Sequence, residues 1–171
     1  RAAQAPGWLQ ELRGTHVPET QEYGIAATTW QARRPLHPQR FFDFIHRPWS
    51  NGRLLRSKGF FWLASKYQEA GSWSQAGGLM RYGFAGRWWR FVPREQWPQD
   101  AETKAEILKK WLPETADCRQ ELVFIGQHID FALLSAELDA CLLTDQEMAL
   151  GVEGWQQLND PFGDWYEEVA A

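Results

Sequence analysis

A chain of 171 residues with 11 Trp and 10 Phe suits one domain, or one domain with tails, that buries a large aromatic core. Its two cysteines show no CxxC spacing, which argues against a disulfide framework or a zinc ribbon and favours a reduced, cytoplasmic setting. The net charge is −4, and the sequence has neither an apolar run of about 18 residues nor a charged-then-apolar leader, so we expect no membrane span and no secretion.

Residues 1–20 are typical of a linker. Proline and glycine interrupt this stretch and leave one short helical piece at residues 8–13. Such a segment leads in from another part of a protein, and the first residue is Arg and not Met. We therefore interpret the chain as a fragment of a longer protein and assign residues 21–171 to a single domain.

The first regular elements follow this linker. Residues 22–33 are rich in β-branched and aromatic side chains and predict a strand, which must end before Pro35. His37 and Pro38 match the N-cap and the first position of a helix. This helix must end at Pro48, because proline cannot continue it.

Residues 54–65 are the stretch around which the sequence is organised. The run Phe-Phe-Trp-Leu at residues 60–63 predicts a strand that is buried on both faces. Gly59 either lets this strand bend or lets another backbone come close. Arg56 and Lys58 lie two residues apart, so an extended backbone points both side chains to one face.

Four further elements are predicted in the middle of the chain. Alternation over residues 72–80 predicts a half-exposed strand, in which the double glycine marks a bulge or a close contact. A strand at residues 86–92, a helix at residues 101–112 and a core strand at residues 121–126 follow.

Two helix starts are marked in the last third of the chain. Asp130 can cap a helix whose apolar residues recur at spacings of three and four. Thr144 and Glu147 match a capping box, which starts a short helix ending at Gly151. Together these elements predict an α+β fold, with a mainly antiparallel sheet of four to five strands and helices packed on one face.

Charge is distributed unevenly along the chain. Between Arg33 and Arg94, ten arginines and two lysines stand against two acids, a local balance of +10, while the rest of the chain carries −14. This polarity predicts either attraction between the two parts or a basic face for an anionic partner. We favour attraction within the chain.

Patterns that support catalysis or bind metals are absent from the sequence. It contains no GxxxxGKS/T phosphate loop, no GxSxG turn and no HxxxH or HExxH spacing, so we predict that this chain is not an enzyme and holds no metal. His37 is interpreted as a helix cap, His128 as a loop residue and Cys141 as a small core residue. Cys118 beside Arg119 is interpreted as structural, with a lowered pKa as the alternative.

One nucleic-acid alternative rests on residues 56–65. The segment starting at Lys58 matches part of the RNA-recognition pattern that begins Lys/Arg-Gly-Phe/Tyr, in which exposed aromatic rings stack on bases and cations meet phosphates. The match is partial, because Phe61 stands where Gly or Ala is expected and Ser65 where an aromatic ring should stack. Single-stranded RNA binding is therefore the alternative to a protein-interaction role.

Seven segments of the sequence follow one another in an order and spacing that is typical of one family. They are residues 15–25, 34–41, 55–64, 73–78, 86–89, 119–126 and 138–145. This series resembles the C-terminal domain of the CobW-type GTPases, and the similarity spans nearly the whole chain, about residues 15–165.

The resemblance implies a parent protein of two domains, in which an N-terminal P-loop GTPase with a CxCC metal motif precedes this domain. Members are proposed metallochaperones, often tied to zinc homeostasis, and the namesake is linked to cobalt insertion in cobalamin synthesis. GTP, Mg and zinc or cobalt are implied for the full-length protein, whose P-loop and CxCC would lie upstream of residue 1. No cofactor is implied for this fragment.

For this domain the resemblance implies a non-catalytic accessory role: contact with the GTPase domain, contact with a client metalloprotein, or oligomerisation. We add a hypothesis about residues, in which Arg53, Arg56 and Lys58, with nearby Trp73, contact the GTPase domain or the client. The charge polarity of the chain and the cations beside a buried strand motivate this hypothesis.

Overall fold

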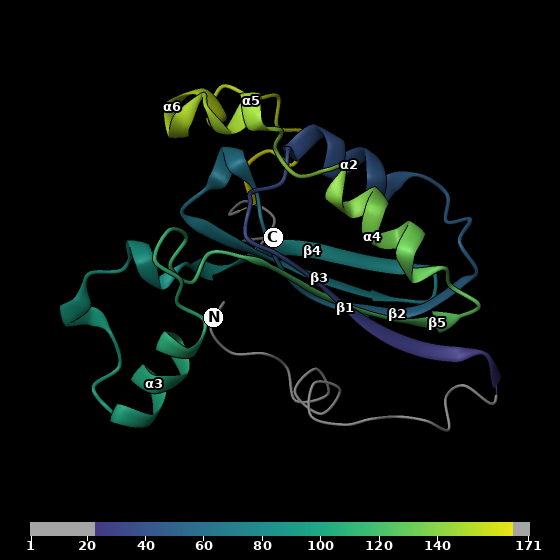
Figure 1. The fold of residues 1–171 in the computed structure, drawn as a ribbon, viewed down its shortest axis with the longest axis horizontal. Coiled ribbons are helices and arrows are strands. Elements are labelled where there is room, and N and C mark those ends of the chain that lie inside the picture. Colours follow the sequence, from purple (N-terminus) through teal and green to yellow (C-terminus); the bar gives the residue numbers. More distant parts are fainter. Residues whose placement is uncertain (1–22, 166–171) are drawn as a thin grey trace.

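The computed structural model describes residues 23–165, and this part of the chain is built on one antiparallel sheet (Figure 1). Five strands lie in the order β1-β5-β2-β3-β4. Their bounds are β1 Ile25–Ala32, β2 Arg53–Trp62, β3 Glu69–Ala76, β4 Leu79–Arg87 and β5 Gln120–Gln127. The predicted α+β fold with a mainly antiparallel sheet is confirmed, whereas the helical piece predicted at residues 8–13 lies outside the described residues.

Two helices, α2 and α4, cover one face of the sheet, as predicted (Figure 1). The shorter α5 and α6 lie beyond the end of α2, and α3 lies away from the sheet (Figure 1). The helix bounds are α2 Pro38–His46, α3 Ala101–Lys109, α4 Phe131–Asp139, α5 Asp145–Met148 and α6 Gly151–Trp155.

Local signals in the sequence determine where α2 and α4 begin. The Nδ1 atom of His37 accepts hydrogen bonds from the backbone N–H groups of Gln39 (3.1 Å) and Arg40 (3.4 Å). Burial lowers the pKa of His37 and so favours the neutral ring, in which Nδ1 can act as an acceptor. The carboxylate of Asp130 accepts from the N–H of Leu133 at 3.0 Å. Both predicted caps are confirmed.

The end of β2, from Gly59 to Trp62, is buried on both faces of the sheet, as its aromatic run predicts. Phe61 and Leu63 pack into the main core under the helices. Phe60 and Trp62 point the other way and pack with Trp88. Each large side chain buried in this way contributes about 1.5–3 kcal/mol to stability, so this short segment ties two cores together.

The double glycine of the β3–β4 region is a hairpin turn, which corrects the prediction of one continuous strand over residues 72–80. Ala76 ends β3, Gly77 adopts a positive φ of 57° and Leu79 begins β4. The alternation continues across the turn because both strands have a period of two, so the pattern could not show the break. The prediction of a strand at residues 86–92 is wrong, because Gly86 and Arg87 are the last residues of β4 and Trp89–Phe91 form a short 3₁₀ helix.

Residues 88–119 form a separate lobe between β4 and β5, which we call the inter-strand lobe. It has its own small core, centred on Trp97 and Ile107. The guanidinium of Arg94 lies 4.1 Å from the ring centroid of Trp97, an arrangement that favours a cation–π interaction. The predicted helix at residues 101–112 is present as α3, which ends three residues earlier.

Ion pairs join the basic part of the chain to the acidic part. Four pairs show this: Arg34 with Asp145 (2.9 Å), Arg40 with Glu147 (2.5 Å), Lys66 with Asp160 (2.5 Å) and Arg47 with Glu137. The predicted attraction within the chain is confirmed for these residues.

The contacts of Glu147 give a testable pH dependence. Its carboxylate accepts two hydrogen bonds from Arg40 and one from the N–H of Thr144, and these contacts, the Arg40 bonds foremost, lower the pKa of Glu147 to about 2 from an ordinary value of 4.5. Because the folded-state pKa is lowered, the stabilisation is complete above pH 4.5 and is lost as the pH falls toward 2.

We expect the Glu147→Gln variant to be less stable than the unsubstituted chain near pH 6, with a difference that shrinks between pH 4.5 and pH 2. Denaturant unfolding curves across this range measure the difference. A difference that stayed constant with pH would contradict the assigned role.

Candidate functional site

The sheet separates the four residues that the sequence nominates as partner contacts. In the β2–β3 register Gly59 lies opposite Trp73, so Trp73 shares the helix-covered face with Gly59. Arg56 and Lys58 alternate with Gly59 and lie on the opposite face. These two cations therefore cannot form one continuous surface with Trp73.

The side chain of Arg53 lies on the same face as Arg56 and Lys58, because Arg53 pairs with Gln127 and Arg56 with Ile125 of β5, and both partners alternate with Phe124. A bulge between Leu54 and Arg56 interrupts the alternation against β5. As a result Leu54, and not Arg53, shares the face of Trp73, and Arg53 borders only the end of the cavity that Trp73 lines. A bulge of this kind leaves no mark on the hydrophobic pattern, so the sequence could not show this division.

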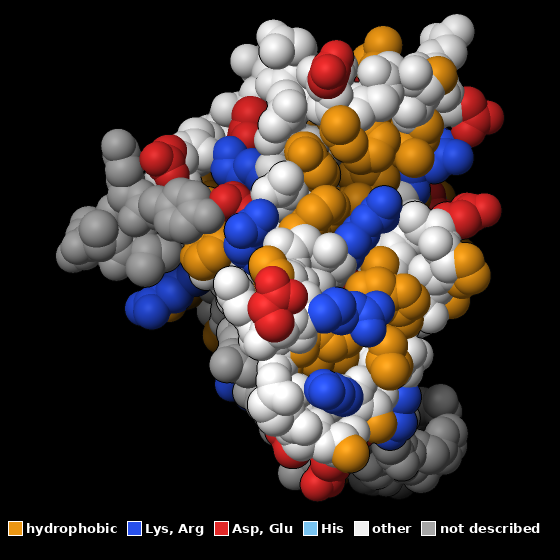
Figure 2. All heavy atoms as spheres, turned by 90° about the vertical axis from the view of Figure 1, so that its left-hand side faces the viewer, with side chains coloured by type: hydrophobic (Ala, Val, Ile, Leu, Met, Phe, Trp, Pro, Cys, Tyr) orange, Lys and Arg blue, Asp and Glu red, His pale blue; other side chains and the backbone are white. Residues whose placement is uncertain are grey.

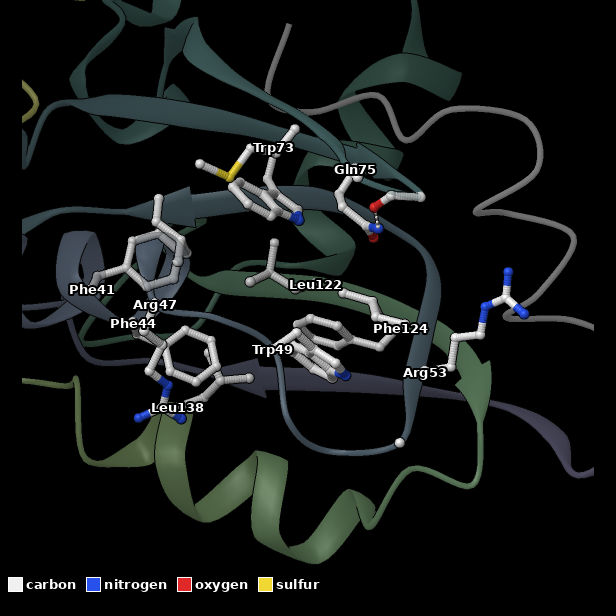
Figure 3. A pocket seen from close by; sticks show the side chains of 16 residues that line it. Phe41, Phe44, Arg47, Trp49, Arg53, Trp73, Gln75, Leu122, Phe124 and Leu138 are labelled. Carbon is white, nitrogen blue, oxygen red and sulfur yellow. Dashed lines mark hydrogen bonds between the residues drawn. The ribbon is translucent and has the colours of Figure 1, made fainter.

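The cavity that Trp73 lines lies between α2, α4 and the sheet, and we call it the aromatic groove (Figure 3). Its volume is about 390 Å³. Leu122 and Phe124 of β5 form its floor, and Phe41, Trp49 and Trp73 enclose it. Sequence reasoning missed Trp49 as a site residue, because its surroundings show only a turn signal.

A chain of hydrogen bonds satisfies the polar groups in the wall of the aromatic groove. The indole Nε1 of Trp73 donates to Oγ of Ser57 (2.7 Å), which donates to Oε1 of Gln75 (3.1 Å). The Nε2 atom of Gln75 donates to the carbonyl oxygen of Gly77 at 2.6 Å (Figure 3). Ser57 and Gln75 are buried, so these bonds offset the desolvation of their polar atoms.

An arginine lies at each end of the aromatic groove (Figure 3). Arg47 is paired with Glu137, and its guanidinium lies 4.7 Å from the ring centroid of Phe44. Arg53 is exposed, and its guanidinium points away from the aromatic side chains into solvent (Figure 3). The charged side chains that line the groove are these two arginines.

Apolar and basic side chains also gather on the side formed by α6 and the inter-strand lobe (Figure 2). Basic residues there are bonded to their neighbours: Arg87 donates to Oε1 of Gln68 (2.8 Å) and Arg90 to the carbonyl oxygen of Glu114 (3.2 Å). The aromatic groove is a better-defined cavity than this surface and is the candidate site.

Both cysteines are buried, as expected for structural residues. Burial raises the pKa of Cys141 to about 11, and it also raises the pKa of Cys118, which overturns the alternative of a lowered pKa beside Arg119.

Within residues 23–165, His, Cys, Asp and Glu side chains form no group of three or more that could hold a metal ion. Over the same range, no helix has both the length and the apolar character needed to cross a bilayer.

Residues 25–142 match the family model described as the cobalamin synthesis protein cobW C-terminal domain. The chain belongs to the CobW C-terminal domain family. The match extends from β1 to the end of α4 and so includes the aromatic groove, and it confirms the resemblance drawn from the sequence.

Curated relatives of this CobW C-terminal domain include zinc-related proteins. The chain is 43% identical over 163 residues to the zinc-regulated GTPase metalloprotein activator 1 of Dictyostelium discoideum, covering 94% of the chain and 34% of the relative. It is 29% identical over 145 residues to a zinc chaperone of Mycobacterium tuberculosis, covering 84% of the chain and 36% of the relative. The chain thus spans about a third of the length of these relatives.

A solved structure, the Zn(II)-bound YjiA GTPase from E. coli, is also similar to the CobW C-terminal domain described here. The superposition has a TM-score of 0.48 at 12% sequence identity and covers 75% of this chain and 33% of that chain.

The burial of the aromatic run in β2 removes the basis of the RNA-binding alternative. Phe60, Phe61 and Trp62 are 7%, 0% and 4% exposed. Base stacking requires an exposed ring face, and here other side chains of the CobW C-terminal domain cover the rings.

Proposed function

We propose that this CobW C-terminal domain is the non-catalytic accessory domain of a GTP-dependent metal chaperone, with zinc as the favoured metal. Family membership and the names of the two zinc-related relatives support the proposal. GTP, Mg and zinc or cobalt would act in the GTPase domain, which residues 1–20 would join to this domain. The whole protein would work in the cytoplasm.

The accessory role consists of contact with the GTPase domain, with a client metalloprotein, or with both. The observation that carries this part of the proposal is the aromatic groove, a preformed apolar cavity with a cation at each end, in a chain that carries no catalytic motif. Trp73 lines this groove and Arg53 borders its end, and Arg56 and Lys58 offer a second, basic contact on the opposite face.

Charge reversal tests the end of the groove and the basic surface of β2 separately. We expect Arg53→Glu, and independently the double change Arg56→Glu with Lys58→Glu, to show which of these two places binds the GTPase domain. The effective substitution should weaken recovery of the isolated GTPase domain in a pull-down about tenfold, or ~1.4 kcal/mol. Lys104→Glu on the exposed side of α3 is the matched control.

The readout uses the GTPase domain of the same protein as bait, together with zinc-dependent client proteins tested one at a time. Recovery of every bait at the level of the unsubstituted chain, with both charge reversals in place, would show that neither place is a contact surface.

A further inference from the structure

The first turn of α2 is capped by a side chain of a type that titrates near neutral pH. Nδ1 of His37 accepts hydrogen bonds from the backbone N–H groups of Gln39 (3.1 Å) and Arg40 (3.4 Å). A ring nitrogen accepts a hydrogen bond only through its lone pair, so the capping ring is neutral and carries its proton on Nε2. In the imidazolium form both nitrogens are protonated, and neither can accept. The usual caps Ser, Thr and Asn do not share this dependence on pH.

Two charged side chains act on the ring of His37, one from α2 and one from α5. Arg40 follows it by three residues in α2, and Nε2 of His37 lies 3.8 Å from Oε2 of Glu147 in α5. Glu147 also accepts two hydrogen bonds from Arg40, so the two neighbours partly offset each other's charge. Burial and then the Arg40 charge lower the pKa of His37, and the attraction of Glu147 does not reverse this direction. The closed turn therefore disfavours the imidazolium form.

The other ionisable groups around this turn have contacts of their own. Asp145 of α5 is paired with Arg34 at 2.9 Å, and Asp43 of α2 accepts a hydrogen bond from a side chain of its own helix at 2.8 Å. The carbonyl oxygen of Cys141 accepts from the backbone N–H of His37 at 2.8 Å, and burial raises the pKa of the Cys141 thiol to about 11. Among the groups named here, His37 is the residue type that ordinarily titrates between pH 5 and pH 7.5.

The first turn of α2 also positions one wall of the aromatic groove. The backbone N–H of Phe41 donates to the carbonyl oxygen of His37 at 3.0 Å, and this bond closes the turn. The Phe41 side chain is 1% exposed and lines the groove. When the turn opens, the backbone that carries this ring is no longer fixed.

We infer that His37 is a pH-dependent cap: its neutral ring keeps the first turn of α2 closed, and uptake of a proton by the ring opens the turn and loosens the Phe41 wall of the aromatic groove. The inference does not depend on the proposed function, because it concerns contacts within this domain.

Proton linkage gives the direction of the effect. In the open turn the ring of His37 faces water and has its ordinary pKa of 6.5, whereas the pKa of His37 in the closed turn is lower. The open form therefore binds more protons than the closed form. As a result, opening is favoured as the pH falls below 6.5 and is unaffected well above it.

Hydrogen exchange of backbone amides, measured by NMR on the full 171-residue chain at pH 7.5 and pH 5.0, tests the inference. Protection factors report the opening of the turn, because they remove the intrinsic pH dependence of exchange. We expect the factors of Arg40 and Phe41 to fall roughly threefold to thirtyfold at pH 5.0, where about thirtyfold is the limit for a closed turn that binds no proton. A smaller fall overturns the inference, because Glu147 would then hold the charged ring in place.

Three variants separate the cap from other titrating groups. His37→Asn keeps a capping oxygen that does not titrate, so the same protection factors should differ less than about twofold between the two pH values. His37→Ala lacks the cap, and its factors should lie about fivefold below those of His37→Asn at both pH values. His46→Asn, at the other end of α2, is the matched control and should retain the fall at pH 5.0.

A fall in His37→Asn as large as that of the unsubstituted chain would assign the response to another group and overturn the inference. Loss of the response in His46→Asn would do the same. The nitrogen chemical shifts of the His37 ring give an independent check at pH 7.5. A proton found on Nδ1 there contradicts the cap itself, since the cap requires the lone pair of that atom.

Discussion

Replacing Gly59 by alanine is expected to lower the free energy of unfolding by about 3 kcal/mol or more. Gly59 has a φ of +151°, a backbone conformation that L residues rarely adopt. A Cβ at this position would lie 2.0 Å from the backbone oxygen of Glu121 in the neighbouring strand β5. Because backbone atoms cannot move aside as a flexible side chain can, β2 and β5 would have to separate locally.

Denaturant unfolding monitored by tryptophan fluorescence measures this loss. Gly83→Ala in β4 is the matched control, since a Cβ there meets no atom within 4 Å. We expect the control to change the free energy of unfolding by less than about 1 kcal/mol, in either direction. Similar losses for the two variants would mean that the cost arises from strand glycines in general and not from the contact with Glu121.

Replacing Gln120 by leucine is expected to cost about 3 kcal/mol of stability. The Gln120 side chain is fully buried, and its Oε1 accepts a hydrogen bond from the N–H of Trp62 at 2.8 Å. Its Nε2 donates to the carbonyl oxygens of Arg34 (2.9 Å) and Trp62 (2.8 Å). Leucine fills the space but leaves the Trp62 N–H and the Arg34 carbonyl without this partner, and each such group costs about 1–3 kcal/mol.

The matched control for Gln120→Leu is Gln31→Leu, the same substitution at an exposed position of β1. Its effect should stay within about 0.5 kcal/mol in the same unfolding measurement. If both variants lost equally little stability, water would replace the Gln120 hydrogen bonds. The side chain of Gln120 would then not hold Trp62, at the end of β2, to Arg34 in the segment that follows β1.

The fold could be predicted where the information is local. The caps of His37, Asp130 and Thr144 are formed by residues within four positions of one another, so the sequence shows them directly. The two-sided burial of residues 60–63 follows from four consecutive apolar side chains. The turn at Gly77 was missed, because two adjacent strands share the same period of two.

The candidate site could be predicted only in part, because it is a tertiary feature. Trp73 and Arg53 were nominated from the sequence; Trp73 lines the aromatic groove and Arg53 borders its end. The sequence predicts Arg56 and Lys58 for the same surface, but their alternation with Gly59, which lies opposite Trp73, places them on the other face of the sheet. Trp49 joins Trp73 only because α2 packs across the sheet, which no spacing in the sequence shows.

The order of the strands has a consequence for the chain as it is synthesised. β1 is an edge strand whose neighbour is β5, and Gln120 follows Ala32 by 88 residues. At about 5–20 residues per second, translation leaves β1 without its partner for roughly 4–18 seconds, whereas a hairpin such as β3–β4 closes in about 1–10 μs. During that interval the apolar side chains of β1 stay exposed on the nascent chain. A ribosome-associated chaperone that binds short extended segments can bind β1 in this period.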